Sequence, residues 1–287
     1  MYDDVRTEHR LKQSITGRWL RRLSRTDAKW TAGVCLVVFL ILALATLALF
    51  QITAKDFAVD AIGSVVNLSF APHQLPDGNE LESLRKAFES GALSEYRPFP
   101  SLKLVITEKD VTGLGPDKIR SNFFRRFASQ LYERGPEGLP RIVEKKRLRE
   151  ELATELGLLS FIDRPAHQKL GNILVVLSII SILLIACLIY LSSGFGRLAN
   201  PGLALLGAGL PGLLVLRLVD RISKMPLLNE TPKHDGDISG LVGGLAKSIL
   251  PPAVARIYPI YSVVFAFGLG LVVLAGALKI VQANSKH

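Results

Sequence analysis

Four long apolar runs divide the chain into membrane and polar parts. Residues 31–50 contain no charge, and residues 170–192 are interrupted only by an asparagine and a few serines. A third, glycine-rich run ends at Leu216, and the last covers residues 257–280. About twenty apolar residues form a helix of about 30 Å, which matches the hydrocarbon core of a bilayer. The pattern predicts four transmembrane helices, at residues 30–51, 170–192, 198–218 and 256–280.

The distribution of lysine and arginine predicts the orientation of these spans. Residues 1–29 contain eight basic and four acidic residues, and the connection after the second span adds Arg197. Because basic residues are enriched on the cytoplasmic side, we expect a multi-pass protein of the cell (plasma) membrane with both termini in the cytoplasm. Residues 52–169 and the loop 219–255 then lie outside, and residues 281–287 form a cytoplasmic tail. The stretch from Arg217 to Arg256 has six basic and four acidic residues, which opposes the rule, but the first span usually determines the orientation.

Residues 52–169 have the composition of a folded, solvated domain, with 18 basic and 17 acidic residues. Apolar and polar residues alternate at positions 66–70 and again at 102–106, which is typical of half-buried strands. Helical patterns lie around these two stretches. The sequence therefore predicts a small α+β extracytoplasmic domain.

Three stretches of this domain carry a helical pattern. Residues 81–88 are followed by a stop signal at Gly91, and residues 140–156 align three leucines. The strongest pattern lies within residues 115–135, where a proline and an aspartate suit the first turn and a glycine suits the end. Its apolar residues recur every four positions and are expected in the domain core: Ile119, Phe123, Phe127 and Leu131.

A basic amphipathic segment, residues 1–29, directly precedes the first span. As a helix it places an apolar half opposite an arc of arginines, a pattern that binds anionic membrane surfaces. We expect five residues to bind the membrane surface: Arg18, Trp19, Arg21, Arg22 and Arg25. A second interpretation is that these charges only fix the topology. Because the apolar half has a membrane to bind, we expect the lipid bilayer as its partner and no nucleic acid.

Two further patterns concern the membrane part. Ala204, Ala208 and Gly212 recur every four residues and form a small-residue face on which another helix can pack closely. Residues 238–250 place their apolar side chains on one helical face but are too short to cross a bilayer. We expect an interfacial helix there, with a re-entrant or irregular segment as the alternative because of its glycines.

No motif in the sequence specifies a reaction, a metal or a cofactor. The five histidines have no metal-ligand spacing, and no phosphate-binding loop or hydrolase nucleophile motif occurs. Glu108 and Asp110 fit the start of a helix better than a pair of catalytic carboxylates. Cys35 and Cys187 lie in apolar runs, so no disulfide framework holds the polar part together. An enzyme whose catalytic residues are far apart in the sequence is kept as an alternative interpretation.

The order of a basic tail, one span, a large external domain and three further spans resembles the membrane subunits of ABC systems for cell division, lipoprotein release and macrolide export. The resemblance covers the topology and no specific motif. In those permeases a long cytoplasmic connection after the second span couples to an ATPase, whereas this chain has only SSGFGRLAN there. The order is equally similar to that of uncharacterised four-span bacterial membrane proteins with a large external domain.

Three functional hypotheses follow from the sequence. The first is a non-enzymatic membrane protein whose external domain, residues 52–169, binds a partner protein, an envelope component or a lipid. The second is a subunit of an ABC-type transport or mechanotransmission system. The third is a membrane enzyme that acts on lipid or envelope material. Nothing in the sequence specifies an oligomeric state.

Overall fold

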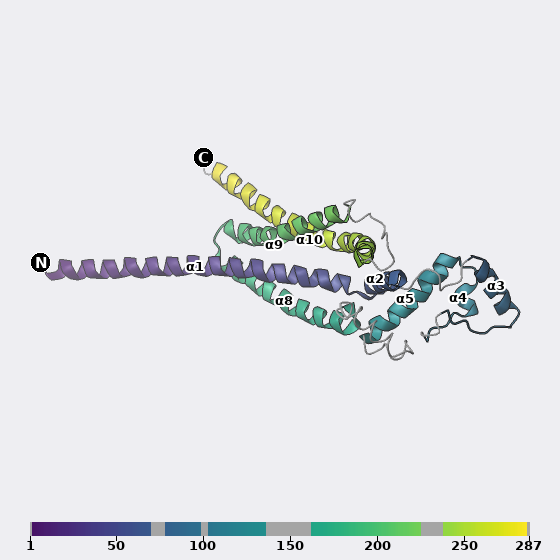
Figure 1. Ribbon diagram of the computed structural model, residues 1–287. Helices are drawn as coiled ribbons and strands as arrows, with labels where there is room; N and C mark the ends of the chain where they lie inside the picture. Colours follow the sequence, from purple (N-terminus) through teal and green to yellow (C-terminus); the bar gives the residue numbers. More distant parts are fainter. Residues whose placement is uncertain (1, 70–77, 99–102, 136–161, 225–237, 286–287) are drawn as a thin grey trace. The chain divides into compact units, whose positions relative to one another are not determined.

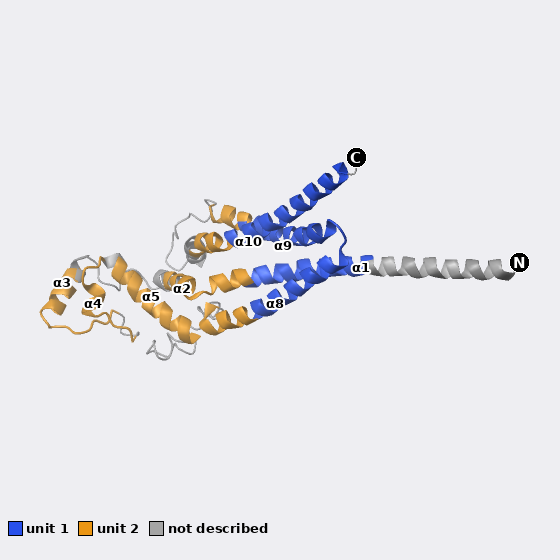
Figure 2. Ribbon diagram, turned by 180° about the vertical axis from the view of Figure 1, so that it is seen from behind, with its two compact units in different colours: residues 1–46, 173–216, 258–287 blue, residues 47–172, 217–257 orange. Residues whose placement is uncertain are grey.

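The computed structural model describes residues 2–69, 78–98, 103–135, 162–224 and 238–285. The chain forms two compact units, which Figure 2 shows in different colours. The first contains residues 1–46, 173–216 and 258–287, and the second contains residues 47–172 and 217–257. The helices, labelled in Figure 1, are α1 (Tyr2–Ile52), α2 (Lys55–Ser69), α3 (Gly78–Glu89), α4 (Glu108–Val111), α5 (Pro116–Arg134), α8 (Arg164–Leu191), α9 (Gly196–Ser223) and α10 (Ile238–Asn284).

The expected α+β fold of residues 52–169 is wrong, because the described residues of this stretch form helices joined by irregular segments and contain no strand. The first expected strand, at positions 66–70, lies in the last turns of α2 as far as Ser69. At the second, Ile106 forms only an isolated antiparallel bridge with Tyr96. Phe70 and Leu102 lie outside the described residues.

Packing explains why the local alternation in α2 did not produce a strand. Ala58, Val59 and Ile62 are buried together in the domain core and recur at helical spacing. A strand would send Ala58 and Val59 to opposite faces, whereas a helix brings all three residues to one face. The buried residues in the first turns of α2 thus favour a helix, and the alternating residues at its end extend that helix.

Among the described residues, four helices are long and apolar enough to cross a membrane, which supports a multi-pass membrane protein. These candidate spans are Thr26–Ile52, Arg164–Leu191, Gly196–Ser223 and Ile249–Asn284. The last belongs to α10, which begins at Ile238, so the expected interfacial segment 238–250 and the span form one continuous helix. The side chains of residues 238–248 lie outside the described part.

Close contacts between small residues join α9 to its neighbours in the first unit. A Cβ atom built on Gly202 would lie 2.9 Å from the carbonyl oxygen of Gly268 in α10, so the two backbones nearly touch. Figure 1 shows α9 and α10 side by side. Ala204 belongs instead to a buried cluster with Leu36 of α1 and Leu188 of α8. The helix α9 therefore presents one face to α10 and another to α1 and α8.

Helix α5 supplies a large part of the core of the 52–169 domain. It begins at Pro116, directly after Gly115, and ends at Arg134, before Gly135, which has a positive φ of 60°. These bounds confirm the helix expected within residues 115–135. The side chain of Phe127 is completely buried. The core contains Ala58, Val59 and Ile62 of α2, Leu84 and Phe88 of α3, Val111 of α4, Ile119, Phe123, Phe124, Phe127, Ala128, Leu131 and Tyr132 of α5, and Leu104 and Ile106 between α3 and α4.

Two other expected helices of this domain have different outcomes. The pattern at residues 81–88 is confirmed by α3, and Gly91 follows with a positive φ of 70°. The expected helix at residues 140–156 lies outside the described residues.

Candidate functional site

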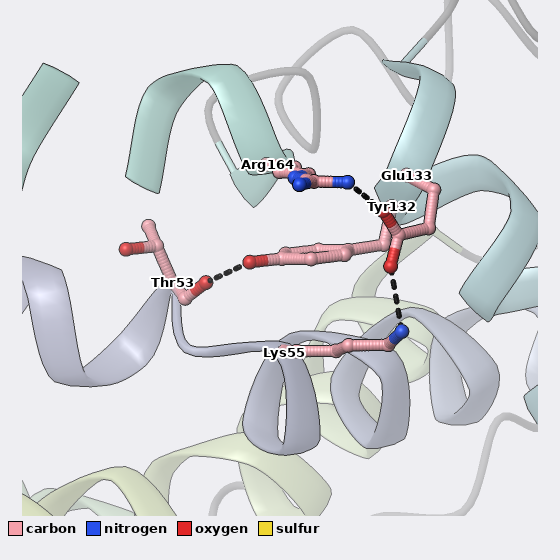
Figure 3. A network of polar contacts seen from close by, with 5 residues as sticks. All are labelled: Thr53, Lys55, Tyr132, Glu133 and Arg164. Carbon is pink, nitrogen blue, oxygen red and sulfur yellow. Dashed lines mark hydrogen bonds and ion pairs between the residues drawn. The ribbon is translucent and has the colours of Figure 1, made fainter. Parts of the chain in front are cut away.

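The C-terminal end of α5 holds the turn at which the first span ends. After Ile52 the chain turns at Thr53, and α2 begins at Lys55. Figure 3 shows the hydroxyl of Tyr132 donating a 3.0 Å hydrogen bond to the carbonyl oxygen of Thr53. Both residues are buried, so this bond stabilises the turn by about 0.5–1.5 kcal/mol. Burial and the nearby charge of Glu133 raise the pKa of Tyr132, which keeps the hydroxyl protonated and able to donate.

The next residue, Glu133, joins two segments that lie at span ends. Its carboxylate accepts hydrogen bonds from Lys55 at 2.6 Å and from Arg164 at 3.0 Å (Figure 3). Lys55 is the first residue of α2, and Arg164 is the first residue of α8. The hydrogen bonds from these two cations lower the pKa of Glu133, so its carboxylate is ionised at neutral pH. We call Lys55, Glu133 and Arg164 the Glu133 clamp.

A threonine–histidine pair lies beside the clamp. The Thr53 hydroxyl is 3.0 Å from Nδ1 of His167 and 3.2 Å from the carbonyl oxygen of Phe50. The imidazole ring stacks on the ring of Phe50 at a centroid distance of 4.0 Å. A hydroxyl beside an imidazole is also the arrangement of a nucleophile and its base. However, Thr53 is only 4% exposed, so a substrate has no access to the hydroxyl and the pair serves packing.

An open cleft of about 360 Å³ lies between α2, α4 and α5. Its charged lining consists of three cations, Lys55, Arg125 and Arg126, and two carboxylates, Asp56 and Asp110. The amide of Asn122 and the hydroxyl of Ser129 add uncharged polar groups, and Val59 adds an apolar one. The cleft can therefore offer hydrogen-bond donors and acceptors together with charges of both signs.

The three cations of the cleft already have carboxylate partners. Arg126 lies 2.7 Å from Asp110 and Arg125 lies 3.3 Å from Asp60, while Lys55 belongs to the Glu133 clamp. All of these pairs are partly or largely exposed, and such pairs contribute about 0–1 kcal/mol each. A ligand anion can therefore exchange for these partners at little energetic cost.

Asp110 has both a structural and an electrostatic role. It accepts hydrogen bonds from the backbone N–H of Thr107 at 2.9 Å and from its hydroxyl at 2.8 Å, which caps α4. This confirms the expectation that Asp110 caps the N-terminus of a helix. Burial alone would raise the pKa of Asp110, but the hydrogen bonds from Thr107 and the charge of Arg126 outweigh it and lower the pKa. The carboxylate therefore remains charged at the cleft wall.

A second, smaller cavity of about 180 Å³ lies between α3 and α4. Its main cation is Arg85, whose guanidinium donates to the carbonyl oxygens of Val111 and Leu114. These bonds attach α3 to the end of α4. Arg85 therefore holds the fold together here, and the larger cleft is the better candidate for a ligand.

The residues expected at functional sites lie elsewhere in the fold. Arg18, Trp19, Arg21, Arg22 and Arg25 belong to α1, but their side chains lie outside the described part, so membrane-surface binding stays a prediction.

The three small residues expected in helix packing lie on α9. Ala204 and Ala208 are buried, and a Cβ atom on Gly212 would lie 1.9 Å from the ring of Tyr261 in α10. Their role in packing stays a prediction.

Sequence reasoning did not identify the clamp or the cleft. It did not single out Lys55 or Glu133 as functional residues. A usable signal was the Lys-Asp pair at positions 55 and 56, directly after the first span. The described residues contain no group of three or more His, Cys, Asp or Glu residues that could hold a metal ion. Comparisons with protein-family models, curated protein sequences and solved structures found no match for this chain.

Proposed function

We propose that this chain is a non-enzymatic integral membrane protein whose 52–169 domain binds a partner protein, an envelope component or a lipid. The observation that carries the proposal is the open polar cleft of about 360 Å³ between α2, α4 and α5. Its charged side chains come from helices fixed by a common buried core, so a ligand would meet groups that are already held in place. The exposed ion pairs at its wall supply charges that a ligand can engage.

We also propose that both termini are cytoplasmic and that the 52–169 domain lies outside the cell membrane. The excess of basic residues in residues 1–29 supports this orientation. Trp30 of α1 is 72% exposed and Tyr190 of α8 is 78% exposed. Each lies at the end of its span away from the 52–169 domain, where aromatic side chains commonly anchor a span at the interface.

A second role proposed for the N-terminal segment is binding to the anionic cytoplasmic leaflet. Replacing Arg18, Arg21, Arg22 and Arg25 with glutamine removes four charges worth about 1 kcal/mol each at such a surface. We expect a synthetic peptide of residues 9–28 to become helical on anionic vesicles, measured by circular dichroism, and the substituted peptide to do so much less. Equal binding to neutral and anionic vesicles, or no helix at all, would leave only a role in topology.

The Glu133 clamp favours one alternative, a subunit of an ABC-type transport or mechanotransmission system. A domain tied to the starts of α2 and α8 by one carboxylate can pass a displacement on to the membrane helices. Such a role needs a cytoplasmic ATPase. Co-purification of an ATP-binding-cassette protein with the full chain in mild detergent would favour this alternative over a binding protein.

The binding function is tested by photo-crosslinking in cells. A photoreactive amino acid replaces Asn122, which is exposed at the cleft, and a matched variant carries it at Arg134, which is exposed on the same helix away from the cleft lining. We expect a specific protein, glycan or lipid adduct at position 122 and none at position 134, detected by mass spectrometry of the purified chain. Adducts at neither position, or equal adducts at both, would contradict a ligand in this cleft.

A further inference from the structure

One wall of the cleft begins three residues after the first candidate span ends. Lys55 follows Ile52, the end of the first candidate span, by three residues, which reach at most about 10 Å. The headgroup layer on each face of a bilayer is about 5–8 Å thick, so Lys55 lies in it or next to it. This wall of the cleft is thus accessible to lipid headgroups.

Contacts with the last span give independent support for this level. Phe57 and Ala61 of α2 are buried against Ala253 of α10, and Ile249, the first residue of the last candidate span, packs beside them. The guanidinium of Arg256 lies 5.5 Å from the centroid of the Phe57 ring. The first two turns of α2, which form one wall of the cleft, are therefore attached to the beginning of a span.

The charges of the cleft select a class of ligand. Three cations and two carboxylates line the cleft, so a ligand that carries both a negative and a positive group meets an opposite charge for each. Asp56 forms no ion pair with any other described residue, so its carboxylate is available to accept hydrogen bonds from a ligand. A headgroup that carries both a phosphodiester and an ammonium group fits both signs of charge.

We infer that the cleft binds the phosphoethanolamine headgroup of a membrane lipid, with the phosphodiester at Lys55, Arg125 and Arg126 and the ammonium group at Asp56. This inference rests on the proposed binding function of the 52–169 domain and names its ligand. Guanidinium groups bind phosphate oxygens through paired N–H donors, and an ammonium group donates to a carboxylate. The position of the cleft beside span ends favours a lipid over a soluble phosphate compound as the source of this headgroup.

The test measures lipid binding to the full chain in detergent. The purified protein is titrated with dihexanoyl phosphatidylethanolamine, and binding is followed by native mass spectrometry. We expect saturable binding that weakens about tenfold or more in Arg125→Gln and in Asp56→Asn, the loss expected for one charge-assisted hydrogen bond. Arg134→Gln is the matched control, because Arg134 is exposed on α5 outside the cleft lining, and we expect it to bind as the unchanged protein does.

Binding of related compounds tests whether the ammonium group contributes to recognition. It also tests whether the ligand is a lipid or a soluble phosphate compound. Dihexanoyl phosphatidylcholine keeps the positive charge but has no N–H donor for Asp56, so we expect it to bind more weakly and to lose less affinity than phosphatidylethanolamine in Asp56→Asn. Equal binding of both lipids, or equal binding in all variants, would overturn the inference. If glycerophosphoethanolamine or inorganic phosphate binds as tightly as the lipid, the lipid is not the ligand. A protein or glycan adduct at position 122 without lipid binding would overturn this inference and keep the proposed binding function.

Discussion

Replacing Phe127 with alanine is expected to destabilise the 52–169 domain by about 3–5 kcal/mol, the usual cost of removing a buried phenylalanine ring. Phe127 has no exposed surface and lies in a core with residues from α2, α3 and α4. A domain of this size is stable by about 5–15 kcal/mol, so the loss is a large fraction of the total. Hydrogen–deuterium exchange of the full chain in detergent should show faster exchange of the α5 amides, by about a hundredfold to a few thousandfold.

Two further variants keep this prediction testable if Phe127→Ala fails to fold. Phe127→Leu retains an apolar side chain and should lose less protection than the alanine variant. Leu93→Ala removes a comparable side chain that is 39% exposed outside the core, and we expect little change in exchange. If Leu93→Ala and Phe127→Ala changed α5 exchange equally, Phe127 would not have the central place in the core that its burial indicates.

The helices of the domain differ in how clearly the sequence specifies them. In α5, a proline at the start, a glycine with positive φ at the end and apolar residues every four positions all indicate the same helix. In α2 the signals conflict, because the alternation at positions 66–70 resembles a strand. Only the burial of Val59 and Ile62 against α5 decides in favour of a helix, and that contact joins segments about sixty residues apart.

The candidate site was harder to predict for the same reason. Lys55, Glu133 and Arg164 are far apart in the sequence, and each alone has the features of an ordinary surface charge. The packing of α5 against α2 and the ion pair between Glu133 and the first residue of α8 bring them together. The sequence does specify that a polar segment directly follows the first span. It does not specify which other segments meet that segment.

The small residues of α9 also show that a local sequence pattern does not predict every close contact between helices. The four-residue spacing selected Ala204, Ala208 and Gly212, but it did not select Gly202, where an added Cβ atom would lie 2.9 Å from the backbone of α10. Close approach also occurs at Gly209, where an added Cβ atom would lie 3.2 Å from a backbone nitrogen of α10. Position 209 is seven residues after position 202, and position 212 is three residues after position 209. Residues at these intervals lie on one side of a helix and can face the same neighbouring helix. The partner helix, rather than the spacing of small residues alone, determines which of them are in contact.

Replacing Gly202 with leucine is therefore expected to separate α9 from α10. Its Cβ atom would lie 2.9 Å from the carbonyl oxygen of Gly268 and 2.9 Å from Cγ2 of Val272, and the backbone at Gly268 cannot rotate away as a side chain can. Overpacking of this kind costs about 1–3 kcal/mol, so the midpoint of thermal unfolding of the full chain in detergent should fall. Gly270→Leu is the matched control, because no atom lies within 4 Å of a Cβ atom built there. Both variants gain about the same helix propensity, so the difference between their midpoints measures the clash, and equal midpoints would contradict the close crossing of α9 and α10.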